Sequence, residues 1–120
     1  MVMHAFSVTE AMVSWLRKMD YEASSDVPGD MPAEFVTVER TGGGASSYVD
    51  HPVMAVQCWA PTPERAEALA NEVRLRLLTE PPPEGVHSVR ANTGPYKFND
   101  PATRRARYQL VLDVACQVAV

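Results

Sequence analysis

A helix with clear ends at the centre of the chain constrains the fold most. Thr62 can accept a hydrogen bond from the first turn, Pro63 suits the first helical position, and Glu64 complements the positive end of the helix dipole. Prolines at 81–83 end the helix abruptly. Apolar residues at helical spacing predict one buried stripe, formed by Ala66, Leu69, Ala70, Val73 and Leu77.

A first helix is predicted near the N-terminus. Ser7 and Glu10 form an S-x-x-E capping box, in which side chains satisfy free N–H groups of the first turn. The residues that follow predict a second apolar stripe, formed by Val8, Ala11, Met12, Trp15, Leu16 and Met19. Residues 22–33 are polar and rich in turn-forming residues, so we expect a loop there.

Alternating apolar and polar residues predict strands at 34–41, 52–60, 86–93 and 107–118. The glycines at 42–44 interrupt the alternation between the first two strands, and we interpret this stretch as a mobile hairpin tip. Gly94 and Pro95 predict a turn after the third strand.

The predicted order α-β-β-α-β-β indicates one α+β domain over residues 1–120. We expect a four-stranded, mostly antiparallel sheet with both helices packed on one face, because each helix then buries its apolar stripe. The 120 residues, of which 46% are hydrophobic, are enough to bury a core. Cys58 and Cys116 lie in apolar strands, so we expect buried free thiols.

Composition argues against several classes of protein. A net charge of −4 and a pI near 5.3 disfavour tight binding of nucleic acid, which needs concentrated cations. The sequence contains no apolar run long enough for a membrane span and no signal-peptide pattern at its start, so we expect a chain of cytosolic origin.

The residues that could carry chemistry do not form a catalytic or metal-binding motif. A phosphate-binding loop needs a helix directly after its glycines, whereas here a strand follows and the helix begins only at Pro63. Ser46 and Ser47 lie in the glycine-rich segment, a poor place to hold a nucleophile. The histidines lack a second ligand at metal-binding spacing: His4, His51 and His87. We therefore predict neither an enzyme nor a cofactor.

The helices can cover only one face of the predicted sheet. The other face would carry Thr37, Glu39, Gln57, Trp59, Gln109, Val111, Asp113 and Gln117. An antiparallel sheet can leave one face in water. An exposed Trp59 beside Val111 and Ala115 nevertheless suggests a partner surface, because tryptophan is enriched in interface cores.

The sequence has one basic cluster, formed by Arg104, Arg105 and Arg107. It is either a solvated loop rim or a docking surface for acidic neighbours. A nucleic-acid role is disfavoured, because Tyr108 is the only aromatic residue beside the cluster that could stack on a base.

The order and spacing of these segments resemble the tail terminator, or tail completion, proteins of long-tailed bacteriophages. The resemblance runs from "FVTVERTGGG" through "DHPVMAVQCWA" into "PTPERAEALANEVRLRL". It continues in "VRANTGPYKFNDPATRRARYQLVLDVACQ", and it covers most of the chain from Phe35 onward. None of these segments is a chemical signature.

The resemblance implies a structural virion protein that assembles in the host cytoplasm. It would form a ring, expected to be a homohexamer, on the head-proximal end of the tail tube, stop tube polymerisation and join the tail to the head connector or stopper. DNA would pass through the lumen without specific binding. The expected contact residues lie in the hairpin, in the later loop and at the strand end: Arg40, Gly42, Gly43, Gly44 and Tyr48; Asn99, Asp100, Arg104, Arg105 and Arg107; and Trp59.

Two alternatives stay open from the sequence. Another ring of the phage neck, a head–tail connector or stopper, would have a similar size and fold. A small ferredoxin-like regulatory domain would instead bind a metabolite in a concave pocket on its open sheet face.

Overall fold

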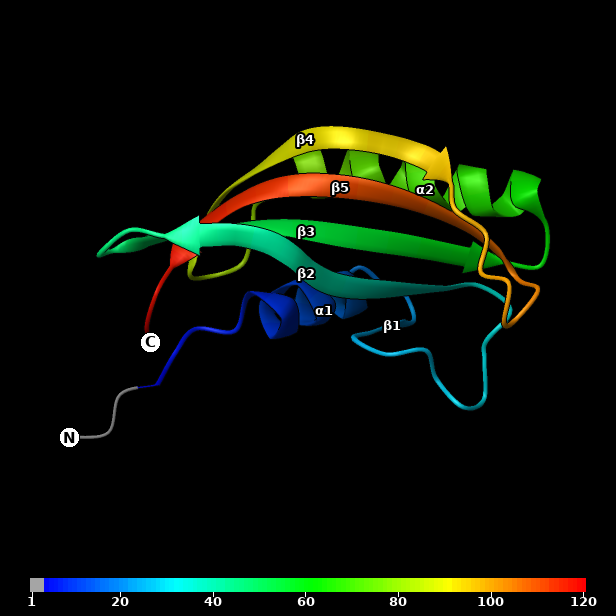
Figure 1. Cartoon of the computed structure of the whole chain (residues 1–120), viewed down its shortest axis with the longest axis horizontal. Helices are drawn as coiled ribbons and strands as arrows, with labels where there is room; N and C mark the ends of the chain where they lie inside the picture. The colour runs from blue at the N-terminus through cyan, green and yellow to red at the C-terminus, as the bar shows by residue number, and fades with distance from the viewer. Residues whose placement is uncertain (1–3) are drawn as a thin grey trace.

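The computed structural model describes residues 4–120, which form one sheet and two helices (Figure 1). The elements in chain order are α1 (Val8–Lys18), β1 (Ala23–Ser24), β2 (Phe35–Ala45), β3 (Val49–Ala60), α2 (Pro63–Thr79), β4 (Val86–Lys97) and β5 (Ala106–Gln117).

The sheet has five strands in the order β1-β2-β3-β5-β4. Strand β1 pairs with β2 in parallel, and the other neighbours are antiparallel. The predicted four-stranded sheet is therefore wrong, and the sheet is mixed. The missed strand lies in the expected loop and has only two residues, Ala23 and Ser24, too few to show an alternation. Tertiary pairing creates it, since the Val36 N–H donates to the Glu22 carbonyl at 2.8 Å.

Both helix starts are confirmed. The Ser7 hydroxyl oxygen accepts a hydrogen bond from the Glu10 N–H at 3.2 Å, and α1 begins at the next residue. The Thr62 hydroxyl oxygen accepts one from the Arg65 N–H at 3.3 Å, and Pro63 opens α2. Local side chains thus satisfy N–H groups that have no partner within the helix.

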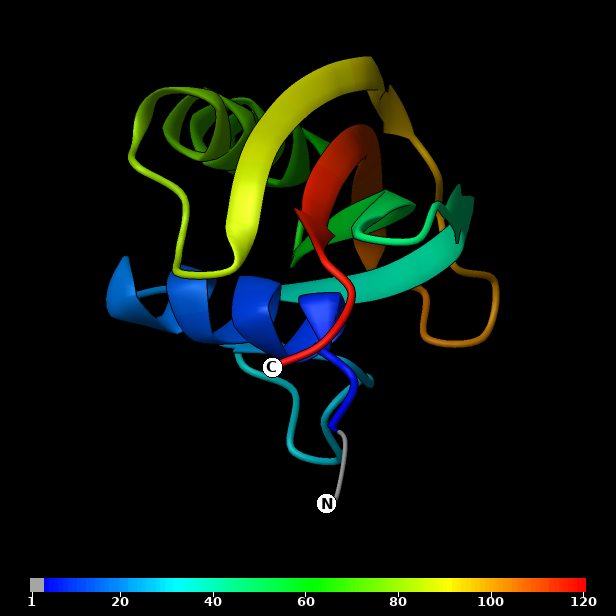
Figure 2. The same cartoon turned by 90° about the vertical axis from the view of Figure 1, so that its left-hand side faces the viewer.

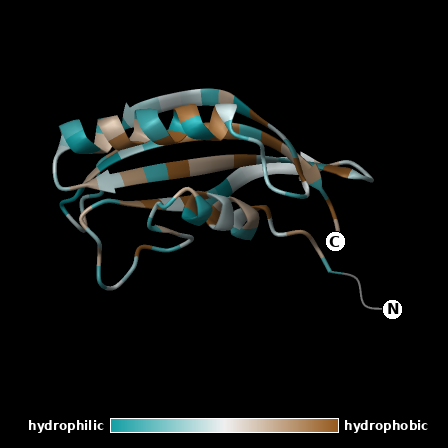
Figure 3. Cartoon of the chain, turned by 180° about the vertical axis from the view of Figure 1, so that it is seen from behind, coloured by the Kyte–Doolittle hydropathy of each residue, from teal (hydrophilic) through white to brown (hydrophobic). Residues whose placement is uncertain are grey.

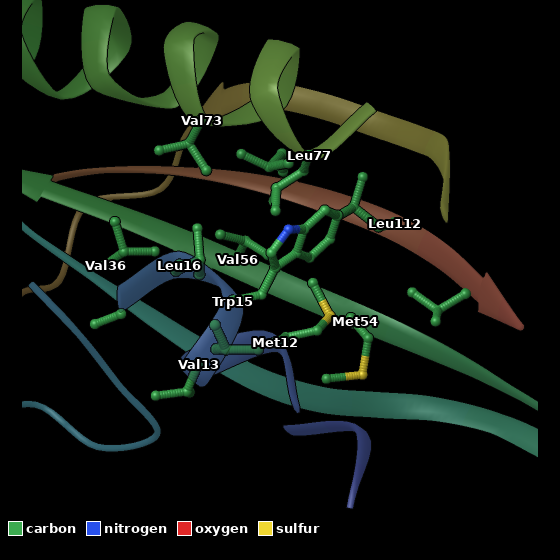
Figure 4. Packing of buried hydrophobic residues seen from close by; sticks show 14 of the residues in the cluster. Met12, Val13, Trp15, Leu16, Val36, Met54, Val56, Val73, Leu77 and Leu112 are labelled. Carbon is green, nitrogen blue, oxygen red and sulfur yellow. The ribbon is translucent and has the colours of Figure 1, made fainter. Parts of the chain in front are cut away.

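The two helices lie on the same side of the sheet, α1 against β2 and α2 against β3, β5 and β4 (Figure 2). Their stripes meet one sheet face in a single core. Trp15 of α1 lies there with Met54, Leu77 and Leu112 (Figure 4). Hydrophobic and hydrophilic residues alternate along α2, which is amphipathic as its sequence predicts (Figure 3). Both cysteines are buried and free, as expected.

The glycine tract is not the hairpin tip. Strand β2 continues through it to Ala45, with a register shift between Arg40 and Gly42, and the turn falls at residues 46–48. The shift accounts for the interrupted alternation, because a β-bulge changes which face the following residues occupy. Gly43 has a φ of +92°, and a Cβ there would lie 2.0 Å from the His51 carbonyl oxygen.

Strand β4 is longer than predicted. It continues past Gly94 and Pro95 to Lys97, with register shifts between Ala91 and Thr93 and between Thr93 and Tyr96. The predicted turn is therefore an irregularity within a strand. Glycine and proline are typical of bulges as well as of turns, so the dipeptide alone does not distinguish the two.

Replacing Gly43 with alanine should destabilise the hairpin. The left-handed backbone and the clash with His51 predict a loss of about 1–3 kcal/mol in the free energy of unfolding. Gly44→Ala is the matched control, because a Cβ there has nothing within 4 Å. Urea denaturation of the two variants measures the difference, and equal stabilities would contradict the assignment of strain to Gly43.

Candidate functional site

A row of buried polar side chains crosses the helix-free face of the sheet. We call Thr37, Gln57 and Gln109 the polar ladder; their exposed fractions are 5%, 5% and 8%. The Thr37 hydroxyl donates to Gln57 Oε1 at 2.8 Å, and Gln57 Nε2 donates to Gln109 Oε1 at 2.8 Å. Gln57 Nε2 also donates to Glu39 Oε1 at 3.0 Å, while Gln109 Nε2 donates to the Tyr96 hydroxyl. The ladder therefore links β2, β3, β5 and β4 through side chains as well as backbone.

Trp59 closes one end of this face and is not exposed. Its exposed fraction is 1%, so the expectation of an exposed tryptophan is wrong. Its ring stacks on Phe35 at 5.2 Å, and its Nε1 donates to the Thr37 hydroxyl oxygen at 3.0 Å. The Arg107 guanidinium lies 4.9 Å from the Trp59 ring and 4.5 Å from that of Phe98. Alternation in the sequence placed Trp59 on the correct face but did not show that neighbouring segments cover it.

The basic cluster separates into residues with different roles. The Arg105 Nη1 donates to the carbonyls of Pro32 and Ala33, both at 2.9 Å, and ties two loops together. Arg107 donates from Nε to the Phe98 carbonyl at 2.6 Å. Arg104 is exposed and has a φ of 59°. Two of the three cations therefore bond to backbone carbonyls of the chain and hold the loop in place.

The other polar loop residues predicted from the resemblance lie in the same segment. Asn99 is exposed, and the Asp100 carboxylate accepts a hydrogen bond from the Ala102 N–H at 3.2 Å. Such a bond from an aspartate to the backbone two residues on stabilises a turn. The loop at 98–105 is thus shaped by its own hydrogen bonds.

The hairpin of β2 and β3 projects beyond β4 and β5 (Figure 1). Its base is held by Arg40, whose guanidinium makes two hydrogen bonds to the Asp50 carboxylate at 2.5 and 2.9 Å. The Arg40 Nε also donates to the Gly42 carbonyl at 3.0 Å. The hydrogen bonds from Arg40 hold the pKa of Asp50 below its usual value. At the tip, Tyr48 is 86% exposed.

The structure therefore places the sequence-predicted residues in two groups. Arg40, the glycines at 42–44 and Tyr48 lie in the hairpin at one end of the molecule. Trp59 and the residues of the 98–107 segment lie at the other end (Figure 1). The sequence interpretation missed the contact between Arg40 and Asp50, although an arginine and an aspartate flanking a hairpin carry the signal for such a pair.

A groove of about 380 Å³ lies on the helix-free face near the hairpin. His51, Ser88, Arg90 and Asp113 line it, together with Val114 and Ala115. The Asp113 carboxylate accepts hydrogen bonds from Asn92 Nδ2 at 3.1 and 3.3 Å. Within residues 4–120, no three histidine, cysteine or acidic side chains are grouped to hold a metal ion. The lining combines charged and polar side chains with apolar ones, whereas small-molecule sites are mostly apolar.

Two further observations concern the described part of the chain. Burial raises the pKa of the Cys58 thiol, which disfavours the reactive thiolate. None of the helices formed by residues 4–120 is long and apolar enough to cross a membrane.

The ion pair at the hairpin base should make stability depend on pH. Because the folded pKa of Asp50 is lowered, its contribution is present above the unfolded value of about 3.9 and disappears as pH falls through the folded value. We expect the stability difference between the wild type and Asp50→Asn to shrink below about pH 4. Thermal unfolding from pH 6 to pH 2.5 measures it, and a difference independent of pH would contradict the assignment.

Breaking the polar ladder should destabilise the sheet. Gln57→Leu removes the donor to Gln109 and the acceptor for Thr37, and an unsatisfied buried polar group costs about 1–3 kcal/mol. Gln117→Leu is the control, since that side chain is only half-buried and lies outside the ladder. Urea denaturation compares the two, and a cost no larger at Gln57 than at Gln117 would contradict a stabilising ladder.

Comparison with known proteins identified no relative. The chain matches no protein-family model and no curated protein sequence. Its function therefore has to be inferred from its own residues and their arrangement.

Proposed function

We propose that this protein is a structural subunit of a bacteriophage tail. Copies of it form a ring at the head-proximal end of the tail tube, stop tube polymerisation and join the tail to the head connector. The starting point is the resemblance in segment order and spacing to tail terminator proteins. By that resemblance the ring has six copies, and the assembled protein resides in the virion.

The projecting hairpin is the observation that carries the proposal. It presents a tyrosine that is 86% exposed, and its base is held by the two hydrogen bonds between Arg40 and Asp50. Tyrosine supplies a large contact area at low conformational cost, and tyrosine is common at the energetic centres of interfaces. A preformed arm of this kind suits contact with another protein, because little of it has to be ordered on binding.

The shape of the subunit also supports a role between two partners. The molecule measures 47 × 27 × 25 Å along its principal axes. The hairpin and the 98–105 loop lie at opposite ends of its longest axis (Figure 1). A protein that joins a tube to a connector needs two separate contact regions. The hairpin and the loop provide them.

The chemistry of the helix-free face suits passage of DNA better than its capture. The buried part of this face consists of the neutral polar ladder, and Glu39 and Asp113 add exposed carboxylates. Arg107, a cation at one end of the face, is stacked between Trp59 and Phe98. Tight DNA binding needs several free cations along a surface, and a net charge of −4 opposes it.

A connector or stopper of the phage neck is distinguished from a terminator by its partner. A terminator binds the end of the tail tube and limits tube length, whereas a connector or stopper binds on the head side. The metabolite-binding alternative receives less support, because the groove at His51 and Asp113 is open and several charged side chains line it.

The direct test is assembly with the tail-tube protein of the same phage. We expect the purified chain to form a ring-sized species alone or on the tube, and to shorten tubes when it is present during their polymerisation. Native mass spectrometry gives the mass, and electron microscopy gives tube lengths. A chain that stays monomeric and leaves tube length unchanged would contradict the proposed function.

Shortening the hairpin side chain should weaken that assembly. Tyr48→Ser should leave the fold intact, because the aromatic side chain of Tyr48 lies in solvent. The substitution should weaken binding of the tube or connector by about tenfold. Val27→Ser is the control, since Val27 is another exposed apolar residue and lies outside the hairpin. Titrations of each variant against tube and connector measure the change, and equal affinities would exclude the hairpin as a contact.

A further inference from the structure

We propose that neighbouring copies of this chain join edge to edge, with β4 of one copy adding to β2 of the next. The sheet then continues from subunit to subunit around the ring. This inference rests on the proposed function for the existence of a ring, and it adds the surfaces through which the ring closes.

Both strand edges required for this contact are open in the single chain. Within residues 4–120, β4 ends the sheet and has β5 as its only strand neighbour. At the other edge, β1 covers β2 only at Val36 and Thr37. The remainder of β2 is mostly exposed from Glu39 onward, as is β4 from Arg90 to Thr93. An open edge presents unpaired backbone N–H and C=O groups that can pair with another chain.

The directions of the strands suit a head-to-tail contact. Strands β2, β3, β5 and β4 alternate in direction across the sheet, because each neighbouring pair is antiparallel. Strands β2 and β4 therefore run in opposite directions. When a second copy is placed beside the first in the same orientation, its β2 is antiparallel to the β4 it meets. All helices then remain on one face of the continuous sheet.

The open parts of the two edges lie at the same end of the sheet, because Ala45 and Val86 are level with each other through Asp50 and Cys116. Strand β2 is free of β1 from Val38 to Ala45. Strand β4 pairs regularly from Ser88 to Ala91, between two register shifts, and its second half contains Pro95, which has no N–H to donate. An antiparallel contact between the later part of β2 and the earlier part of β4 uses the suitable part of each strand. Strand β1 limits how far the neighbour can slide.

Charge determines which edges meet. Glu39 lies on the helix-free face of β2, where its carboxylate accepts from Gln57. Arg90 is the register partner of Asp113 and so lies on the same face of β4. Both residues are exposed. Opposite charges on facing strands stabilise their pairing and like charges destabilise it, so we expect the contact to take the register that brings Glu39 near Arg90.

The same charges disfavour a symmetric dimer. Pairing β4 with a second β4 brings Arg90 of one copy toward Arg90 of the other, and pairing β2 with β2 does the same to Glu39. Pairing β2 with β4 brings unlike charges together and uses a different patch on each copy. Such a heterologous contact produces a closed ring when its rotation closes.

Charge reversal tests this contact in the full-length chain. Glu39→Arg and Arg90→Glu should each fold, because both positions are exposed, and each should raise the concentration needed for half-assembly about tenfold. An equimolar mixture of the two variants should assemble again, because alternating copies place unlike charges at every contact. Lys18→Glu is the matched control, since this exposed lysine at the end of α1 lies outside both strands and both proposed contact regions, and its reversal should leave ring closure unchanged.

Hydrogen exchange provides a second measurement that does not depend on charge. Backbone amides within 38–45 and 86–91 should become protected from exchange on assembly. The two segments should be protected to the same extent, because every copy in a closed ring uses both edges. Circular dichroism of each variant verifies that it remains folded.

The outcomes separate the two proposals. If the wild type stays monomeric with and without the tail tube, both the ring and its edge contact are overturned. If rings form but neither reversal weakens them and neither edge gains protection, the edge contact is wrong while the proposed function stands. If Arg90→Glu co-assembles with the wild type as dimers and Glu39→Arg has no effect, β4 pairs with β4 and the head-to-tail contact is overturned.

Discussion

The sheet has two faces, and the chain supplies helices for only one of them. On the covered face, α1 and α2 bury their apolar stripes against strands β2 to β5, and transfer of apolar surface from water stabilises this layer. The opposite face has no helix within the described residues and must be stabilised by the strands and loops themselves. The contacts that cover this second face determine which parts of the sheet remain exposed.

Its closure combines polar and aromatic contacts in place of a second apolar layer. The polar ladder satisfies buried amide and hydroxyl groups across the sheet, and a fully satisfied network avoids the cost of burying such groups without partners. At one end, Trp59 stacks on Phe35 while Arg107 covers it. Arg105 and Arg107, two of the three arginines in the basic cluster, thus make contacts within the chain. A charged side chain in a loop therefore indicates docking only when its partners within the chain are known.

The surfaces that remain free are the two strand edges and the ends of the long axis. Helices and the polar ladder occupy the faces, which is why the proposed association with other copies uses the places where the sheet stops. The Arg40–Asp50 pair and Gly43 give the projecting hairpin a defined shape, which suits a structural protein whose contacts repeat in every copy. Glu39 and Arg90 differ in sign at opposite edges, which makes the two edges unequal and would give the proposed assembly a direction.

The amino-acid sequence by itself determined the features that depend on local chemistry. Both helix starts follow from Ser7 and Thr62, because a cap and the first turn it satisfies lie within a few residues. The sequence also indicated the α+β class, the buried cysteines and the sheet face that carries Trp59, since these depend on periodicity and polarity along one segment.

Tertiary structure decided whatever depends on segments distant in the chain. Strand β1 exists because Glu22 meets Val36, and no pattern within two residues reveals such a strand. Trp59 is buried because Phe35 and Arg107 fold against it, and Arg105 is structural because the carbonyls of another loop lie within reach. The open edges are likewise a property of the strand order. Periodicity reports the face a residue occupies, whereas only the assembled sheet determines what covers that face and where the sheet ends.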